Sequence, residues 1–229
     1  MIFKSNKSFS NSKFKLINDK KSILLRKYFK KNSNKNFKSI VKQNNFKDHK
    51  IYNFNIVSAK TKTSYEIIKK KNYYEMFFYY GKSGDEILQS SNIHEIIFLR
   101  DWIKTKFFEK KIKNFYKINT NIFFDKLEEI DKKIKDKKFL EIFTKKYIPD
   151  FKKKLIKQTI YYPKDYECHG DFTLSNIIIS YSDKRITLID FLKTYNENII
   201  QDYAKLYQEF KFGWSARYLD PVKNTRSLI

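Results

Sequence analysis

Short apolar runs separated by polar turns form the clearest pattern in the last third of the chain. Residues 177–179 are three consecutive isoleucines, a polar turn follows at 182–184, and a second apolar run occupies 186–189. Two β-rich runs joined by a polar turn are typical of a hairpin. The hairpin would bring Asn176, which precedes its first strand, and Asp190, which follows its second, to the same end.

The upstream pattern predicts further strands and then helices. Apolar runs at 14–17 and 22–28 flank a short turn and predict strand, turn and strand. A short helix is expected over 35–49, and the alternating stretch 64–80 predicts another strand. Residues 86–160 follow helical spacing in most places. The pattern therefore predicts an α+β protein with a β-rich first part and a mainly helical second part.

Candidate chemistry is concentrated just before the predicted hairpin, in the run from His169 to Asn176. Phosphoryl transfer needs a carboxylate beside the attacking hydroxyl and Mg²⁺ held against the phosphates. In kinase catalytic loops an Asp accepts the hydroxyl proton and an Asn five residues later binds metal. Asp171 and Asn176 have this separation. Carboxylate and amide oxygens suit Mg²⁺, so Asp190 at the same end of the hairpin completes a candidate metal site.

These residues resemble the aminoglycoside phosphotransferase and choline kinase family. The resemblance rests on Cys168-His169-Gly170-Asp171, on Asn176, and on Ile189-Asp190-Phe191. It implies a two-lobed protein kinase-like fold. A small N-lobe with a nucleotide-covering β-sheet and one helix would occupy residues 1–80. A mainly helical C-lobe with the catalytic loop and acceptor site would occupy 81–229.

The resemblance also implies roles for single residues. Asp171 would be the catalytic base, and His169, predicted as a catalytic-loop residue, would order the loop instead of acting as a base. Asn176 and Asp190 would be Mg²⁺ ligands. Asp202 would brace the catalytic loop from a following helix.

ATP is the implied phosphate donor, and its contacts are assigned by the order of elements. Lys27 is the candidate for the lysine that contacts the phosphates, with Lys30 or Lys31 as alternatives if the strand register slips. Backbone groups from Glu75 to Phe77 would bind the adenine edge.

Two features depart from the family pattern. No Glu lies between Asn32 and Lys47, where the family has a helix Glu that pairs with the strand lysine; Gln43 is the nearest polar substitute, with Asp48 beyond it. The loop over residues 5–12 contains no Gly, although Gly favours close backbone approach to phosphate. The chain also stops soon after the matching segment, which leaves truncation at the C-terminus open. These departures favour an alternative function, a nucleotide-binding pseudokinase or a decayed, truncated kinase.

A second phosphate-binding motif can be dismissed. Gly81-Lys82-Ser83 ends like a P-loop, but that motif requires a Gly five residues before its Gly-Lys. Met76 occupies that position. We expect a hinge turn at 81–83.

The formal charge of +24 affects the choice of partner. Such a charge suggests nucleic acid or an anionic membrane, but the basic residues are spread along the chain and Lys, Asn, Ile, Phe and Tyr are enriched together, as an AT-rich gene would encode. A nucleic-acid-binding module is therefore the least favoured function, while peripheral contact with an anionic membrane is kept as a hypothesis. Polycationic aminoglycosides would need an acidic pocket, so a neutral or anionic acceptor is expected.

The remaining signals are weak. Cys168 is the single cysteine, and the acidic residues Asp125, Glu128, Glu129 and Asp131 form a cluster that is typical of a solvated helix face. No apolar run has the length of a membrane span, and the N-terminus lacks a signal-peptide core.

The sequence thus predicts a cytoplasmic, ATP- and Mg²⁺-dependent kinase that phosphorylates a hydroxyl of a small molecule, such as a sugar or a surface-glycan precursor.

Overall fold

The computed structural model describes residues 14–19, 22–28, 34–63, 68, 73–90, 92–108, 115–117, 120–134, 143–157, 161–163, 167–194 and 197–214. Contacts divide the chain into two compact units. The first comprises residues 1–110, 169–193 and 201–229, and the second comprises 111–168 and 194–200. The residues of the candidate site all belong to the first unit.

A three-stranded antiparallel sheet forms from the N-terminal strands of the first unit. Its order is β1 (Phe14–Asp19), β2 (Ser22–Tyr28) and β5 (Tyr73–Phe77). The predicted hairpin over 14–28 is thus confirmed, with Phe14 paired to Lys27. Lys27 therefore lies on the central strand of this sheet.

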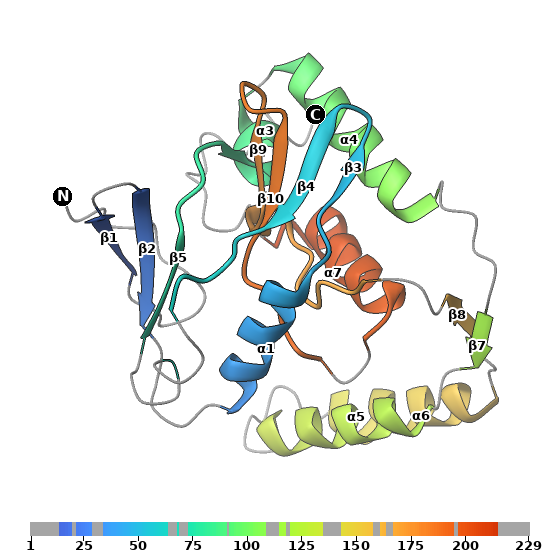
Figure 1. Cartoon of the computed structure of the whole chain (residues 1–229). Coiled ribbons are helices and arrows are strands. Elements are labelled where there is room, and N and C mark those ends of the chain that lie inside the picture. The colour runs from blue at the N-terminus through green and yellow to red at the C-terminus, as the bar shows by residue number, and fades with distance from the viewer. Residues whose placement is uncertain are drawn as a thin grey trace. The chain divides into compact units, whose positions relative to one another are not determined.

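The predicted hairpin at 177–189 belongs to a second sheet of five strands. The order of that sheet is β3 (His49–Ile51), β4 (Phe54–Ser58), β10 (Arg185–Leu188), β9 (Ile177–Ser180) and β6 (Lys82–Ser83). Ile177 pairs with Leu188. Asn176 and Asp190 therefore flank the same end of the hairpin, as predicted. Figure 1 shows β4 beside the orange hairpin.

Strand β4 runs parallel to β10, and the pattern of the sequence did not predict this pairing. Asn55 pairs with Arg185 and Ser58 with Leu188. The backbone N–H of Ala59 extends the ladder by donating to Leu188 O at 3.0 Å. One sheet thus joins the N-terminal part of the chain to the strand that leads into Asp190.

Helices pack around this sheet to bury the core of the first unit. They are α1 (Asn34–Asn45), α3 (Gly84–Gln89), α4 (Ile93–Phe108), a short 3₁₀-helix (Leu174–Asn176) and α7 (Ile199–Phe212). Phe172 has no exposed surface and lies against Trp102 and Phe107, with its ring centroid 5.9 and 5.4 Å from theirs. The helix predicted over 35–49 is confirmed as α1, although it ends four residues earlier.

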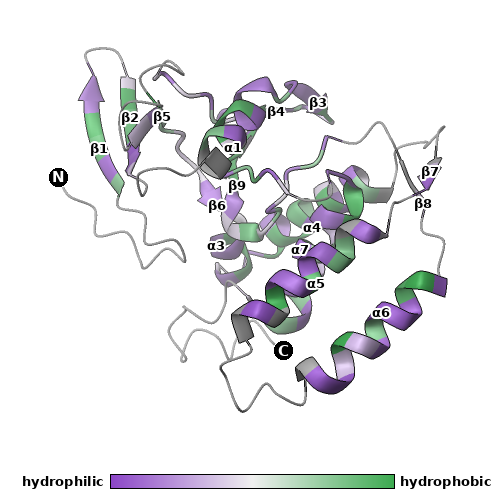
Figure 2. Ribbon diagram, turned by 90° about the horizontal axis from the view of Figure 1, so that it is seen from below, coloured by the Kyte–Doolittle hydropathy of each residue, from purple (hydrophilic) through white to green (hydrophobic). Residues whose placement is uncertain are grey.

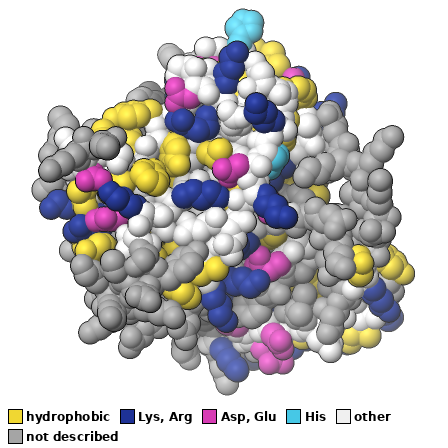
Figure 3. All heavy atoms as spheres, in the orientation of Figure 1, with side chains coloured by type: hydrophobic (Ala, Val, Ile, Leu, Met, Phe, Trp, Pro, Cys, Tyr) yellow, Lys and Arg dark blue, Asp and Glu magenta, His cyan; other side chains and the backbone are white. Residues whose placement is uncertain are grey.

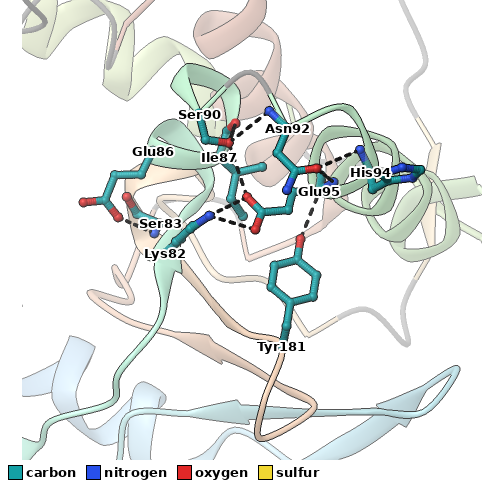
Figure 4. Close-up of polar contacts among 9 residues, drawn as sticks. All are labelled: Lys82, Ser83, Glu86, Ile87, Ser90, Asn92, His94, Glu95 and Tyr181. Atoms are coloured by element: carbon teal, nitrogen blue, oxygen red, sulfur yellow. Dashed lines mark hydrogen bonds and ion pairs between the residues drawn. The ribbon is translucent and has the colours of Figure 1, made fainter.

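The hinge turn predicted at 81–83 is wrong for the last two residues, because Lys82 and Ser83 form the edge strand β6; Gly81 precedes it as a bend. Gly81 has φ +157°, and a Cβ there would meet Ile179 O at 2.6 Å, so Gly permits the close pairing of β6 with β9. Helix α3 follows directly, because Ser83 N–H donates to the Glu86 carboxylate at 2.7 Å and begins the helix. Lys82 contacts both Glu95 oxygens at 2.8 Å (Figure 4).

The second unit is mainly helical. It contains α5 (Asn121–Ile134), a π-helix (Phe143–Tyr147), α6 (Ile148–Lys157) and a small hairpin of β7 (Phe115–Lys117) with β8 (Tyr161–Pro163). Helix α6 alternates hydrophilic and hydrophobic residues along its length (Figure 2), and it buries Ile148 and Leu155. Asp125 and Glu128 on α5 are exposed, which agrees with a solvated face.

The first part of the chain is β-rich and the rest is mainly helical, so the predicted α+β class is confirmed. The division into lobes at residues 80 and 81 stays a prediction, as does truncation, since residues 215–229 lie outside the described part. Lys and Arg side chains on the face in Figure 3 occur on several elements, with Asp and Glu among them. Among the described helices, each is too short or too polar to cross a membrane.

Candidate functional site

Helix α7 holds the start of the candidate catalytic loop, residues 169–176. Asp202 is fully buried, and its carboxylate oxygens accept hydrogen bonds from two successive backbone N–H groups, His169 at 2.7 Å and Gly170 at 2.6 Å. Hydrogen bonds to an ionised acceptor are among the stronger ones in proteins. Gly170 has φ +88°, a conformation that Gly adopts without strain. The predicted brace from Asp202 is therefore confirmed.

His169 is a positioning residue for this loop. Its side chain is 1% exposed, with Nε2 2.8 Å from Ile189 O and Nδ1 3.2 Å from the Asp171 N–H. These partners assign a neutral ring that donates from Nε2 and accepts at Nδ1. Burial, together with the charge of Lys106, lowers the pKa of His169 to about 3. The ring therefore links the loop to the end of β10 without carrying a charge.

The candidate base is held from two sides. Asn176 donates through Nδ2 to Asp171 O at 2.8 Å and lies 3.3 Å from Asp171 Oδ2. Lys205 Nζ lies 2.9 Å from Asp171 Oδ1. The Asp171 side chain is 26% exposed, so its carboxylate can still be reached by a substrate hydroxyl.

Asp190 follows β10 by two residues and contacts Lys27 of β2. Its Oδ2 accepts a hydrogen bond from Lys27 Nζ at 2.6 Å, across 163 residues of sequence. The backbone of Asp190 has φ +56°, a left-handed conformation that is rare for residues other than Gly. Such strained conformations cluster at functional sites.

The donor set fits Mg²⁺. Asp190 Oδ1 is buried and has no hydrogen-bond partner, which leaves a carboxylate oxygen for a cation. Asn176 makes its two contacts through Nδ2, so its amide oxygen takes no part in them. Among the described residues no three His, Cys, Asp or Glu side chains gather into a metal cluster. Mg²⁺ usually binds one or two carboxylates and completes its shell with waters and phosphates.

Gln43 occupies the place on α1 where the resemblance implies a Glu. Its side chain is 3% exposed, with Nε2 donating to Ala59 O at 2.5 Å and Oε1 accepting from Phe191 N–H at 3.3 Å. Ser58 Oγ donates to the backbone O of Gln43 at 2.6 Å. A neutral amide thus contacts Phe191, the residue after the candidate metal ligand, and Asp190 is the carboxylate that pairs with Lys27.

The adenine-binding role of Glu75 and Phe77 stays a prediction, and the structure shows their polar groups engaged within the chain. The Glu75 N–H donates to Thr63 Oγ1 at 2.9 Å, and the Phe77 N–H donates to Lys60 O at 3.2 Å. The Glu75 carboxylate pairs with Arg26 at 2.5 Å. An adenine contact at this strand would need other backbone groups or a rearrangement.

Lys205 is the site residue that the sequence reading missed. It follows Asp202 by three residues, and residues three apart lie on one face of a helix. Because Asp202 was already expected to face the catalytic loop, this spacing could have placed Lys205 beside Asp171.

A comparison with known protein families finds a match over the segment that contains most of the candidate site. Residues 167–226 match the family model described as the phosphotransferase enzyme family. A search of curated proteins finds no match. The matched segment contains the candidate base, both candidate metal ligands and the bracing Asp202. The predicted resemblance to the aminoglycoside phosphotransferase and choline kinase family is thus confirmed over residues 167–226.

Proposed function

We propose that this protein transfers the γ-phosphoryl group of Mg²⁺-bound ATP to a hydroxyl of a small molecule. The observation that carries the proposal is the contact of Lys27 with Asp190 at 2.6 Å. It joins a lysine of the N-terminal sheet to an acidic residue of the phosphotransferase-family segment. Local sequence pattern does not bring these two groups together.

Each residue of the candidate site would have a separate role in phosphoryl transfer. Asp190 and Asn176 would hold Mg²⁺, which when bound neutralises phosphate charge and orients the transferred group. Lys27, whose Nζ lies 2.6 Å from Asp190 Oδ2, would contact the phosphates. Asp171 would accept the proton of the acceptor hydroxyl. In support, its carboxylate lies 3.3 Å from the side-chain nitrogen of Asn176, the second candidate metal ligand.

The proposal is tested by separating nucleotide binding from transfer. Mg²⁺ and ATP together should raise the melting temperature of the wild-type protein, and Asp190→Ala should abolish this rise. Asp171→Asn should keep the rise but lose phosphoryl transfer to an acceptor library. An exposed acidic residue outside the site, Asp125, supplies the control Asp125→Asn. Wild-type turnover in Asp171→Asn would show that Asp171 is not the base.

A second candidate is a nucleotide-binding protein without transfer activity, as in a pseudokinase or a decayed kinase. The observation in its favour is the neutral Gln43 at a position where the resemblance implies a charged partner for the strand lysine. Stabilisation by Mg²⁺ and ATP without transfer to any acceptor would support this candidate.

The acceptor and the cellular setting belong to the same proposal. A sugar or a surface-glycan precursor fits a chain with 49 basic and 25 acidic residues better than a polycationic aminoglycoside does. We place the activity in the cytoplasm, where ATP is available, with peripheral contact to anionic lipid as a further hypothesis. Vesicle pulldown at moderate salt tests the lipid contact.

A further inference from the structure

The ion pair between Lys205 and Asp171 is not required by the roles assigned above. Lys205 Nζ lies 2.9 Å from Asp171 Oδ1, and the two side chains are 27% and 26% exposed. The pair is therefore open to a substrate, unlike the buried contacts of Asp202 and His169 in the same loop.

Helix α7 fixes the place of this ammonium group. Asp202, one helical turn before Lys205, binds the backbone N–H groups of His169 and Gly170. Gln201 adds a hydrogen bond from Nε2 to Gly170 O at 3.3 Å. These hydrogen bonds attach α7 to the loop, so the backbone of Lys205 is held beside the candidate base, Asp171.

The geometry places the acceptor close to Lys205. Asp171 Oδ2 lies 3.3 Å from Asn176 Nδ2, and Asp171 Oδ1 lies 2.9 Å from Lys205 Nζ. A substrate hydroxyl that donates to either oxygen must therefore share it with Asn176 or with Lys205. A hydroxyl that donates to Oδ1 over about 2.7 Å places its oxygen within about 5.6 Å of Lys205 Nζ. A substituent one or two bonds from the hydroxyl can then contact the ammonium group.

We infer that Lys205 binds an anionic group, a carboxylate or a phosphate, next to the acceptor hydroxyl. The inference rests on the proposed phosphotransferase function and names its substrate class: hydroxy acids and phosphorylated hydroxyl compounds. A cationic acceptor would place like charges together, which suppresses binding. Within the described part of the site, Asp171 and Asp190 each face a lysine, and Asp202 faces backbone N–H groups.

Two matched series of compounds test the preference for an anion. Glycerol, glycerate and 2-amino-1,3-propanediol are a neutral, an anionic and a cationic three-carbon acceptor; glucose, gluconate and glucosamine are the six-carbon counterparts. With Mg²⁺ and ATP, we expect the anionic member to have a kcat/KM roughly tenfold or more above the neutral one, as a charge-assisted hydrogen bond allows. Equal values, or a preference for the cationic member, would overturn the inference.

Variants of Lys205 assign the preference to this residue. Lys205→Gln should remove most of the ratio between anionic and neutral acceptors, and Lys205→Arg should retain it. Lys211→Gln, which changes an exposed lysine of the same helix, should keep the wild-type ratio. If kcat/KM in Lys205→Gln falls equally for neutral and anionic acceptors, the inference is overturned. Lys205 would then act on the transferred phosphoryl group, which is common to all the acceptors.

A binding measurement distinguishes failure of the inference from failure of the proposed function. In the presence of Mg²⁺ and ADP, glycerate and gluconate should raise the melting temperature of the wild-type protein more than glycerol and glucose do, and Lys205→Gln should lose this difference. Selective anion binding without any transfer would contradict the proposed function and support the anion site. Phosphoryl transfer without selective anion binding would support the proposed function and contradict the anion site.

Discussion

The side-chain oxygen of Gln43 accepts a hydrogen bond from the backbone N–H of Phe191, 148 residues further along the chain. The same amide donates to Ala59 O. A carboxylate at this position could accept the first hydrogen bond but could not donate the second. Gln43 therefore joins Phe191 and Ala59 through one side chain, which an ionised Glu cannot do.

Gln43→Glu should destabilise the protein. The carboxylate would lie beside the Ala59 carbonyl in a place that is 3% exposed. Loss of a buried hydrogen bond and desolvation of a charge cost roughly 1–3 kcal/mol or more. Thermal melting checks the loss, with Gln89→Glu, a half-buried change on α3, as the control. A Gln43→Glu protein as stable as wild type would contradict this prediction.

Lys27→Met should alter the response to Mg²⁺ in a specific direction. Lys27 and a metal ion compete electrostatically for the Asp190 carboxylate, because Lys27 contacts Oδ2 and Oδ1 is the oxygen left for a cation. Without the lysine, Mg²⁺ alone should stabilise the protein more than it stabilises wild type. The additional stabilisation by ATP should be smaller, since the phosphates lose a cation. Melting curves with Mg²⁺, with ATP and with both separate these effects; identical Mg²⁺ responses would contradict the competition.

Asp202→Asn should loosen the catalytic loop. An Asn has one acceptor oxygen in place of two, and its NH₂ group would face one of the two N–H donors, from His169 or Gly170. We expect a loss of about 2 kcal/mol or more in the free energy of unfolding. Urea unfolding measures this value, and Asp125→Asn should change it little. An unchanged stability in Asp202→Asn would mean that the loop is held by other contacts.

The buried His169 should make stability depend on pH. Its pKa of about 3 in the folded protein lies below the ordinary value of 6.5. Below pH 6.5 the unfolded chain therefore binds a proton that the folded chain excludes. Stability should fall as the pH drops from about 6.5, by up to about 1.4 kcal/mol per pH unit, and this contribution should be constant above 6.5.

Unfolding in urea at pH 5.5 and 7.0 measures this dependence. His169→Gln should lose part of the difference between the two values, because the variant has no imidazole to protonate. The exposed His94→Gln should keep the wild-type difference. If His169→Gln and wild type lose the same free energy between the two pH values, His169 is not its source.

The sequence predicted those parts of the site that depend on local order. Asn176 and Asp190 are brought together by a hairpin whose two strands are adjacent in sequence, so the apolar pattern determines their register. Asp202 was placed by the family resemblance. Lys27 was chosen from the order of strands, and its contact with Asp190 supports that choice.

Long-range pairing escaped prediction because no local pattern encodes it. The parallel pairing of β4 with β10 joins segments about 130 residues apart, and either strand could pair with other apolar runs equally well. The contact of Lys205 with Asp171 depends on how α7 meets the loop. The backbone groups of Glu75 and Phe77 are engaged by a neighbouring segment, residues 60–63, that the pattern did not place.

The parallel pairing of β4 has a consequence for the candidate metal ligand. Gln43 binds Ala59 O, Ala59 N–H binds Leu188 O, and Phe191 N–H binds Gln43, so the three hydrogen bonds form a closed ring. The backbone from Leu188 to Phe191 forms one side of that ring, and Asp190 is part of this backbone segment. Its left-handed conformation costs on the order of 1–3 kcal/mol. The ring prevents this strain from relaxing unless a buried hydrogen bond breaks, so Asp190 keeps its position before any metal ion or nucleotide arrives.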